Sequence, residues 1–435
     1  MLALALPVVA SSLLERAVGI IDVFLVGGLG ASAIAAVGAS QLLVFMVSSM
    51  VAGLPAGTVV VVAQLWGAGR RPEAAAGARR VAGIALATGV AVGLCGMLWA
   101  AHAVMLLGAS PEVVGLAQPY LRIVFAAFPF VFLVTVFSGI LQGTGDTRSP
   151  LYVTTLMNII HVAVAYPTIY GAWGVPRWEL EGAALAVAVS NAVGAGCLAV
   201  IAYRRGLLAR GRSDHFVRAV ARVGAPVSVD RTLQQAAQLV FAKVVLLYGT
   251  TAYAAHQVGL AIEALSYLPG AGFALAAETT FGRSLGARTV ARARMQSLEA
   301  SRMALVVMAA MGVLFYVSPY VLLRLFTDDR TVIDLGTRFL HIVALLQIPL
   351  ALTMVVSGTL KGAGDTRFLL FSTLAGAWGV RVPLALLFAY GLHLSLAAVW
   401  SVMLADWMVR MVVVLARYRS GAWRSHRVLW GAEAR

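Results

Sequence analysis

The stretch LQGTGDTR at residues 141–148 returns later in the chain as LKGAGDTR at residues 360–367. The two aspartates of these copies lie 219 residues apart, and the same offset pairs Pro7 with Pro226. A repeat of this length in an apolar chain is typical of a membrane transporter built from two related halves. The repeat therefore predicts two lobes with a substrate path between them.

Composition places the chain in a membrane. Of its 435 residues, 61% are hydrophobic and only 12% are charged, which is too little charge to cover a soluble protein of this size. Many apolar runs reach about 20 residues, the length that crosses a bilayer as a helix. We therefore expect an all-α, polytopic membrane protein with the lipid bilayer as its surroundings.

The formal net charge of +15 raises the possibility of a nucleic-acid partner, but the placement of the bases argues against one. Alternate gaps between apolar runs are basic, as in the positive-inside pattern of membrane proteins. We therefore expect no nucleic-acid partner. The arginine-rich gaps hold Arg70, Arg71, Arg79 and Arg80; Arg204, Arg205, Arg210, Arg212 and Arg218; and Arg283, Arg288, Arg292, Arg294 and Arg302.

Twelve apolar spans fit the chain, six on each side of one basic linker. An even number of spans puts both termini on one side, and the basic tail marks that side as cytoplasmic. The predicted organisation is an N-terminal six-helix lobe at 1–203, a cytoplasmic linker at 204–221, a C-terminal six-helix lobe at 222–416 and a cytoplasmic tail at 417–435. The two lobes are expected to be parallel, pseudo-symmetric repeats.

The cysteines and histidines show no spacing typical of a metal site, so we expect no metal and no bound cofactor. Cys95 and Cys197 lie in apolar runs and are expected to be small buried hydrophobic residues. His161 and His256 lie within predicted helices and are expected to be packing residues.

These features together resemble one transporter family. The helix from Pro7 to Asp22, the segment GASAIAAVG at 30–38 and the twinned GxGDTR loops are similar to those of multidrug and toxic compound extrusion (MATE) transporters. The stretch 256–269 is similar to the DNA-damage-inducible (DinF-like) branch. The resemblance implies a V-shaped twelve-helix exporter of bulky, often cationic or amphiphilic drug-like compounds, driven by entry of H⁺ or Na⁺. For such a protein we expect a monomer in the inner (plasma) membrane.

Acidic residues inside the spans are the first candidates for function, because a charge there costs about 2.5–3.5 kcal/mol on translocon scales. Asp22 is the strongest candidate, and it also holds the position of the family's first-helix aspartate, which is used in cation coupling. The resemblance makes Asn158 a partner of Asp22. The family's sodium-type arrangement carries oxygen-bearing residues where this chain has Val162 and Val187. We therefore expect the proton-motive force to drive transport, with Na⁺ coupling disfavoured.

The second half departs from the family pattern. Many relatives carry an acid where Gln234 stands, and Asp230, one turn earlier, is the candidate substitute for coupling. Glu263 and Glu278 are fifteen residues apart on one predicted helix, about four turns, so they face similar directions. We expect Glu263, Glu278 and Gln234 to line the substrate cavity.

The twinned loops are expected to be structural turns that gate closure between helices. They follow a predicted membrane helix and lack the Lys-Ser/Thr pair of a phosphate-binding loop. The residues assigned to this role are Gly145, Asp146, Arg148, Gly364, Asp365 and Arg367.

The predicted function is a secondary antiporter that exports bulky cationic or amphiphilic compounds in exchange for protons by alternating access. Two alternatives remain open: a Na⁺-coupled drug antiporter, and a flippase or exporter of lipid-linked or polysaccharide precursors. The second would need a basic-lined cavity, whereas the spans hold six acids and few bases, chiefly Arg16, Lys243 and Arg381. An enzyme is not predicted, because the longest expected outer loop, at 171–181, carries no nucleophile or metal set.

Overall fold

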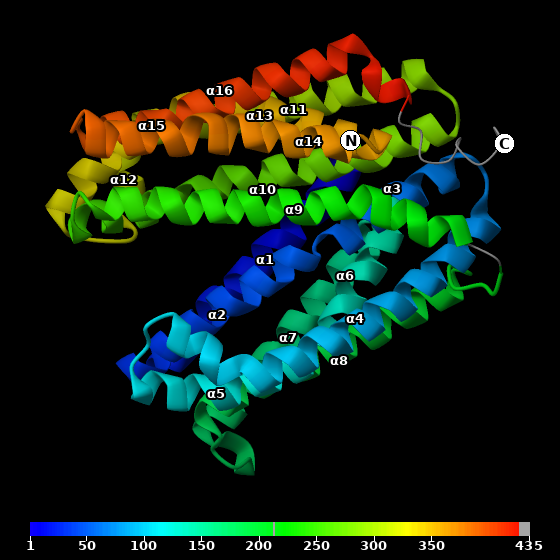
Figure 1. Ribbon diagram of the computed structural model, residues 1–435. Helices are drawn as coiled ribbons and strands as arrows, with labels where there is room; N and C mark the ends of the chain where they lie inside the picture. The colour runs from blue at the N-terminus through cyan, green and yellow to red at the C-terminus, as the bar shows by residue number, and fades with distance from the viewer. Residues whose placement is uncertain (212–213, 426–435) are drawn as a thin grey trace. The chain divides into compact units, whose positions relative to one another are not determined.

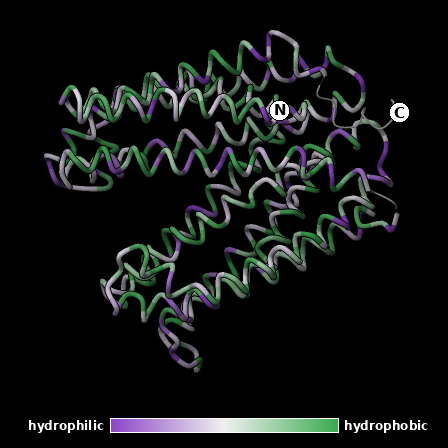
Figure 2. Tube along the Cα trace, in the orientation of Figure 1, coloured by the Kyte–Doolittle hydropathy of each residue, from purple (hydrophilic) through white to green (hydrophobic). Residues whose placement is uncertain are grey.

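The computed structural model describes residues 1–211 and 214–425, so Arg212 of the predicted linker and residues 426–435 of the predicted tail lie outside the described residues. Every regular element of the described chain is a helix (Figure 1). Hydrophobic residues dominate these helices, and hydrophilic residues gather mainly near helix ends (Figure 2). The chain divides into an N-terminal unit, Ala10–Gly224, and a C-terminal unit, Met1–Val9 with Ala225–Arg435.

The N-terminal unit is built around two helix packings. Helix α4 packs against α5 and α6, and α7 packs along α8. Glycines allow these close approaches, since a Cβ at Gly93 would lie 2.5 Å from the carbonyl oxygen of Phe125. The elements are α1 (Leu2–Gly27), α2 (Ala31–Val51), α3 (Gly53–Gly67), α4 (Arg71–Leu106), α5 (Pro111–Ala126), α6 (Phe128–Gly143), α7 (Arg148–Tyr170), η1 (Ala172–Gly174) and α8 (Glu179–Arg204).

The C-terminal unit is centred on α13, which packs against α10, α11 and α16. Two π-helical segments, η2 and η3, interrupt the helix that precedes α16. The elements are α9 (Asp214–Leu246), α10 (Thr250–Gly286), α11 (Val290–Val317), α12 (Pro319–Arg324), α13 (Arg330–Ala363), α14 (Thr366–Thr373), η2 (Leu374–Arg381), α15 (Val382–Leu386), η3 (Leu387–Gly391), α16 (Leu396–Ser420) and η4 (Ala422–Ser425).

The helix lengths confirm the predicted all-α, multi-pass fold. Among the described residues, ten helical segments are long and apolar enough to cross a membrane, and α5 with α6, bent by 47°, make an eleventh. The remaining long helix is α9, with 33 residues. It is the repeat counterpart of α1, and its first turns carry charged residues such as Arg218 and Arg222, which lower its mean hydropathy.

The boundary between the units runs through α1 and α9 instead of between helices. Residues Met1–Val9 of α1 belong to the C-terminal unit, and the first part of α9, up to Gly224, belongs to the N-terminal unit. A Cβ at Gly272 would lie 3.0 Å from the carbonyl oxygen of Ala5, and a Cβ at Gly224 would clash with the carbonyl of Gly53. The offset of 219 residues turns one contact into the other, so each half contributes the start of its first helix to the opposite unit.

Candidate functional site

The best-defined polar contact inside the N-terminal unit joins α1 to α7. The Nε2 atom of His161 lies 2.6 Å from the Oδ1 atom of Asp22. Their side chains are only 6% and 16% exposed, respectively. Two polar side chains at this distance in an apolar unit require a proton between them, because an imidazole lone pair and a carboxylate oxygen repel each other.

Other polar groups surround this pair. Tyr120 of α5 is buried and lies close enough to Asp22 for their charges to interact. The hydroxyl of Tyr170 donates to the carbonyl oxygen of Leu25, 2.6 Å away, and so ties α7 to the end of α1. The C-terminal half of α7 is thus held at two places to the α1 segment that contains Asp22.

Asn158 was expected to be the partner of Asp22, but the structure gives that place to His161. The Nδ2 atom of Asn158 is buried and, within the described residues, has no hydrogen-bond partner. His161 follows Asn158 by three residues on α7, nearly one helical turn. The sequence signal for this contact is a lone histidine in an apolar helix, which is also typical of a packing residue.

In the C-terminal unit, Asp230 forms a small polar cluster with Gln234. The Oδ2 atom of Asp230 accepts a hydrogen bond of 2.9 Å from Nε2 of Gln234, and Gln234 also donates to Oγ1 of Thr373, 3.4 Å away. Asp230 is 7% exposed. The structure therefore brings together one predicted coupling residue and one predicted cavity residue.

A second buried cluster in this unit surrounds Asp406, which is fully buried. Its Oδ1 atom lies 2.6 Å from Nε of Arg410, one turn later on α16, and its Oδ2 atom lies 2.7 Å from Nε of Arg381. Arg381 also donates to Oε1 of Gln238 on α9, 3.1 Å away. Gly376 of η2 leaves room for the cluster, since a Cβ there would meet Asp406 and Arg410. One aspartate is thus held between two arginines.

Glu263 and Glu278 are both buried on α10, at 8% and 6% exposure. Both carboxylates interact electrostatically with basic residues. Glu263 interacts with Arg381, and Glu278 interacts with Lys361 and Arg231. Neither glutamate lines the apolar pocket described below. Their predicted cavity role stays a prediction.

The twinned loops share a glycine conformation and each forms an aspartate–arginine ion pair. Gly145 and Gly364 both adopt φ +88°, a conformation that glycine takes without strain. Asp146 forms an ion pair with Arg205, just after α8. Asp365 lies 2.7 Å from Nε of Arg417 on α16. Each loop is therefore tied to the sixth long helix of its own half.

The remaining loop residues differ in exposure. The Oδ1 atom of Asp146 accepts from the backbone N–H of Arg148 and of Ser149, at 3.2 and 3.1 Å, and so caps the start of α7. The side chains of Arg148 and Arg367 are exposed. The aspartates of the motif thus bind other groups of the protein, while the side chains of its arginines are exposed.

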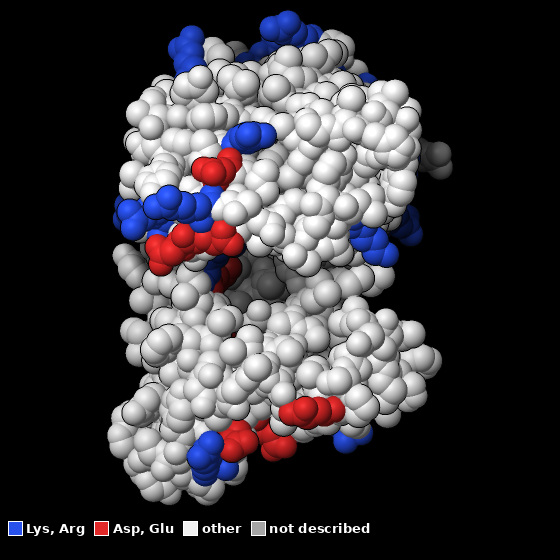
Figure 3. Space-filling model, turned by 90° about the vertical axis from the view of Figure 1, so that its left-hand side faces the viewer, with Lys and Arg blue, Asp and Glu red and all other residues white. Residues whose placement is uncertain are grey.

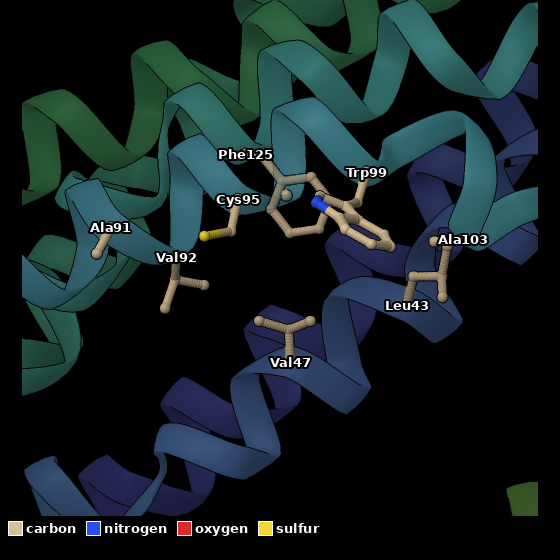
Figure 4. Close-up of a pocket in the computed structure, with 9 residues that line it drawn as sticks. Leu43, Val47, Ala91, Val92, Cys95, Trp99, Ala103 and Phe125 are labelled. Carbon is tan, nitrogen blue, oxygen red and sulfur yellow. The ribbon is translucent and has the colours of Figure 1, made fainter.

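An apolar pocket of about 600 Å³ lies in the N-terminal unit between α2, α4 and α5 (Figure 4). Cys95 was expected to be buried, but it is exposed and lines this pocket. The reason is that α4 leaves a gap beside α2 at this level, so an apolar position on α4 faces the pocket instead of a neighbouring helix. The lining residues are Leu43, Val47, Ala91, Val92, Cys95, Gly96, Trp99, Ala103 and Phe125.

The comparisons with known proteins identify the family and the fold. The MatE family model matches residues 7–167 and 226–387, one segment in each half. The chain is a multi-pass membrane transporter by this match and by its helices. It belongs to the MATE family, and the predicted family is confirmed at this level.

Individual relatives cover nearly the whole chain. A Thermotoga maritima protein described as "Probable multidrug resistance protein NorM" is 29% identical over 98% of this chain and 93% of its own length. A Proteus mirabilis protein described as "Multidrug resistance protein MdtK" is 24% identical over 88% of this chain and 86% of its own length. A solved structure of a MOP superfamily transporter from Pyrococcus furiosus shares the fold with a TM-score of 0.89, at 22% identity over 97% of this chain and 95% of that chain.

Proposed function

We propose that this protein is a proton-coupled antiporter that exports bulky cationic or amphiphilic drug-like compounds by alternating access. The observation that carries the proposal is the Asp22–His161 contact, a proton-binding carboxyl group in a largely apolar helix of a MATE transporter. The names of the relatives as multidrug resistance proteins support the drug-like substrate class. Acids within the spans favour cationic cargo.

Proton coupling is favoured over Na⁺ coupling by the composition of the site. Sodium needs several oxygen ligands, by analogy with other hard cations, whereas Val162 and Val187 offer none. The partner that Asp22 does contact is an imidazole nitrogen, which binds protons readily and is a poor ligand for a hard cation. No bound cofactor enters this proposal.

The experiment is uphill efflux of a cationic dye from proteoliposomes, with a ΔpH and a Na⁺ gradient imposed separately. We expect efflux with ΔpH alone. Efflux with a Na⁺ gradient and no ΔpH would replace the proton by Na⁺ and leave the antiporter intact. No uphill efflux with either gradient would contradict drug antiport.

An exporter of lipid-linked or polysaccharide precursors is the second candidate, because Arg381 and Arg410 are bases inside the C-terminal unit. Both arginines bind Asp406 in the structure, so one negative charge already offsets part of their positive charge. The two functions can be separated by adding a polyprenyl phosphate to the dye-efflux assay. Inhibition of dye efflux by the polyprenyl phosphate, at concentrations where a second cationic dye does not inhibit, would favour this second function.

We further propose an inner-membrane monomer of the DinF-like branch with both termini in the cytoplasm. Figure 3 views the face at the left of Figure 1, and acidic and basic side chains occur there together on a mostly uncharged surface. The arginine-rich loops of the positive-inside pattern are assigned to the cytoplasm. Cysteines placed singly at Arg210 and Trp178 test this orientation. Labelling of position 210 by an external impermeant reagent would invert it.

A further inference from the structure

The partner of Asp22 adds a second titratable group to the proposed coupling site. His161 and Asp22 come from α7 and α1 of one unit, and their contact distance is 2.6 Å. An aspartate that bound its proton alone would need only a neutral hydrogen-bond donor beside it. The neighbour here is instead an imidazole, which has a second ring nitrogen that can itself bind a proton.

We propose that the coupling proton is held jointly by Asp22 and His161, so that His161 is a proton-sharing, positioning residue of transport. The inference rests on the proposed proton coupling and deepens it. It assigns the bound proton to the pair instead of to the aspartate alone.

The proton balance of the pair is simple. In the unloaded state, neutral His161 carries its proton on Nε2 and donates it to the Asp22 carboxylate, so the pair has a charge of −1. Uptake of one proton forms a new N–H bond at Nδ1 of His161 or a new O–H bond on Asp22. No other bond forms or breaks, and the loaded pair has no net charge. Release to the other side reverses the step.

Burial makes the change of charge consequential. The two side chains are nearly excluded from the surface, and a net charge is costly in an apolar unit whereas a neutral pair is not. The pair with its added proton and the pair without it therefore favour different surroundings. If these surroundings differ between two conformations of the transporter, the proton binds one conformation more tightly and shifts the equilibrium toward it.

The charged and titratable groups on neighbouring elements leave this assignment intact. Helix α6 carries none, and α8 carries Glu179, Glu181, Tyr203 and Arg204 at its ends and Cys197 two turns from its C-terminus. On α5, Tyr120 interacts with Asp22, while Glu112 lies about two turns away and Arg122 is exposed. The remaining ones are Glu15 and Arg16 on α1, and Arg148, Tyr152, Tyr166 and Tyr170 on α7.

The test is the pH profile of efflux for the variant His161→Gln. Glutamine keeps an N–H donor for Asp22 but does not bind a proton. Initial rates of ΔpH-driven ethidium efflux are measured between pH 5 and 9 at constant ΔpH and without Na⁺, in proteoliposomes of phosphatidylethanolamine and phosphatidylglycerol. His102→Gln, an exposed histidine on α4, is the matched control.

We expect the midpoint of the profile to move toward acid by about one pH unit or more in His161→Gln and to stay in place in His102→Gln. The reason is that a carboxyl group in model peptides titrates about 2.6 units below an imidazole. An unchanged midpoint in a folded, active variant would overturn the joint site while leaving proton-coupled antiport standing. Wild-type protein without ΔpH-driven efflux would instead refute the proposed function itself.

A second measurement covers the case in which His161→Gln does not fold. In ¹⁵N-histidine-labelled protein, the ring-nitrogen resonances of one imidazole should differ between Asp22→Asn and the wild type, because its anionic partner is gone. If all histidine resonances are identical in the two proteins, Asp22 and His161 do not share a proton.

Discussion

The two units treat a buried aspartate in opposite ways. In the N-terminal unit, Asp22 contacts one imidazole, and the pair can exist with or without an added proton. In the C-terminal unit, Asp406 lies between Arg381 and Arg410, two groups that stay charged at all working pH values. The two halves therefore share their helices but hold these aspartates among different partners, one imidazole in the first and two guanidinium groups in the second.

The largest effect should come from Asp22→Asn, which we expect to abolish coupled transport while the protein stays folded and binds drug. Asparagine is close in size to aspartate and resembles its protonated form, so the packing loss is small. The position 219 residues later is Phe241, so the C-terminal unit has no copy of this acid. Dye efflux at matched expression is the measurement, with Glu112→Gln, an exposed acid on α5, as control. Efflux equal to that of the wild type would remove Asp22 from the mechanism.

Asp406→Asn should act on stability instead. It leaves two buried arginines without their common counter-ion, and breaking a buried pair in this way costs about 3–5 kcal/mol. Unfolding of the detergent-solubilised protein by heat or denaturant measures the loss. Asp334→Asn, an exposed acid of α13, should change stability by less than about 0.5 kcal/mol. Equal stability of the two variants would show that Asp406 is not held as described.

The twinned loops allow a comparison within one motif. Asp365 is 1% exposed and its partner Arg417 is 21% exposed, so Asp365→Asn should cost about 1.5–3 kcal/mol, the range for a hydrogen bond to a charged group. Asp146 is 14% exposed beside a 48% exposed Arg205, and an exposed ion pair contributes about 0–1 kcal/mol. Asparagine also caps a helix nearly as well as aspartate. The same unfolding assay measures both variants. A larger loss of stability in Asp146→Asn than in Asp365→Asn would contradict this expectation.

The starts of α1 and α9, which each pack in the opposite unit, should show the smallest difference between the units. Gly272→Ala places a methyl group 2.5 Å from a side-chain atom of Val9 and 3.0 Å from the carbonyl oxygen of Ala5. Gly224→Ala places one against the carbonyl oxygen of Gly53. We expect about 1–3 kcal/mol of destabilisation from each, the range for overpacking. Gly38→Ala, with open space around its Cβ position, is the control and should not destabilise. Unfolding midpoints measure all three. A loss confined to one unit would show that the two exchanges are not equivalent.

Much of the fold follows from the sequence alone. The apolar runs, the alternating arginines and the twinned loops are local signals, and each depends on residues close together in the chain. Asp22 is a candidate from the sequence because an acid stands out in an apolar helix.

The partners across helices were not predictable in the same way. His161 and Asp22 are 139 residues apart, and nothing local to α7 distinguishes a packing histidine from one that meets an acid. The expected partner, Asn158, lies one turn away from the residue that makes the contact. The rotation of α7 about its axis decides between them, and that rotation is set by packing against α8 along its whole length.

The exchange of helix starts also has a consequence for biosynthesis. Residues Met1–Val9 are synthesised long before Gly272, which Ala5 and Val9 approach. At about 5–20 residues per second, the interval is on the order of tens of seconds. During that time the start of α1 lacks its packing surface. Completion of the C-terminal unit therefore requires capture of a segment that was synthesised well before the rest of that unit.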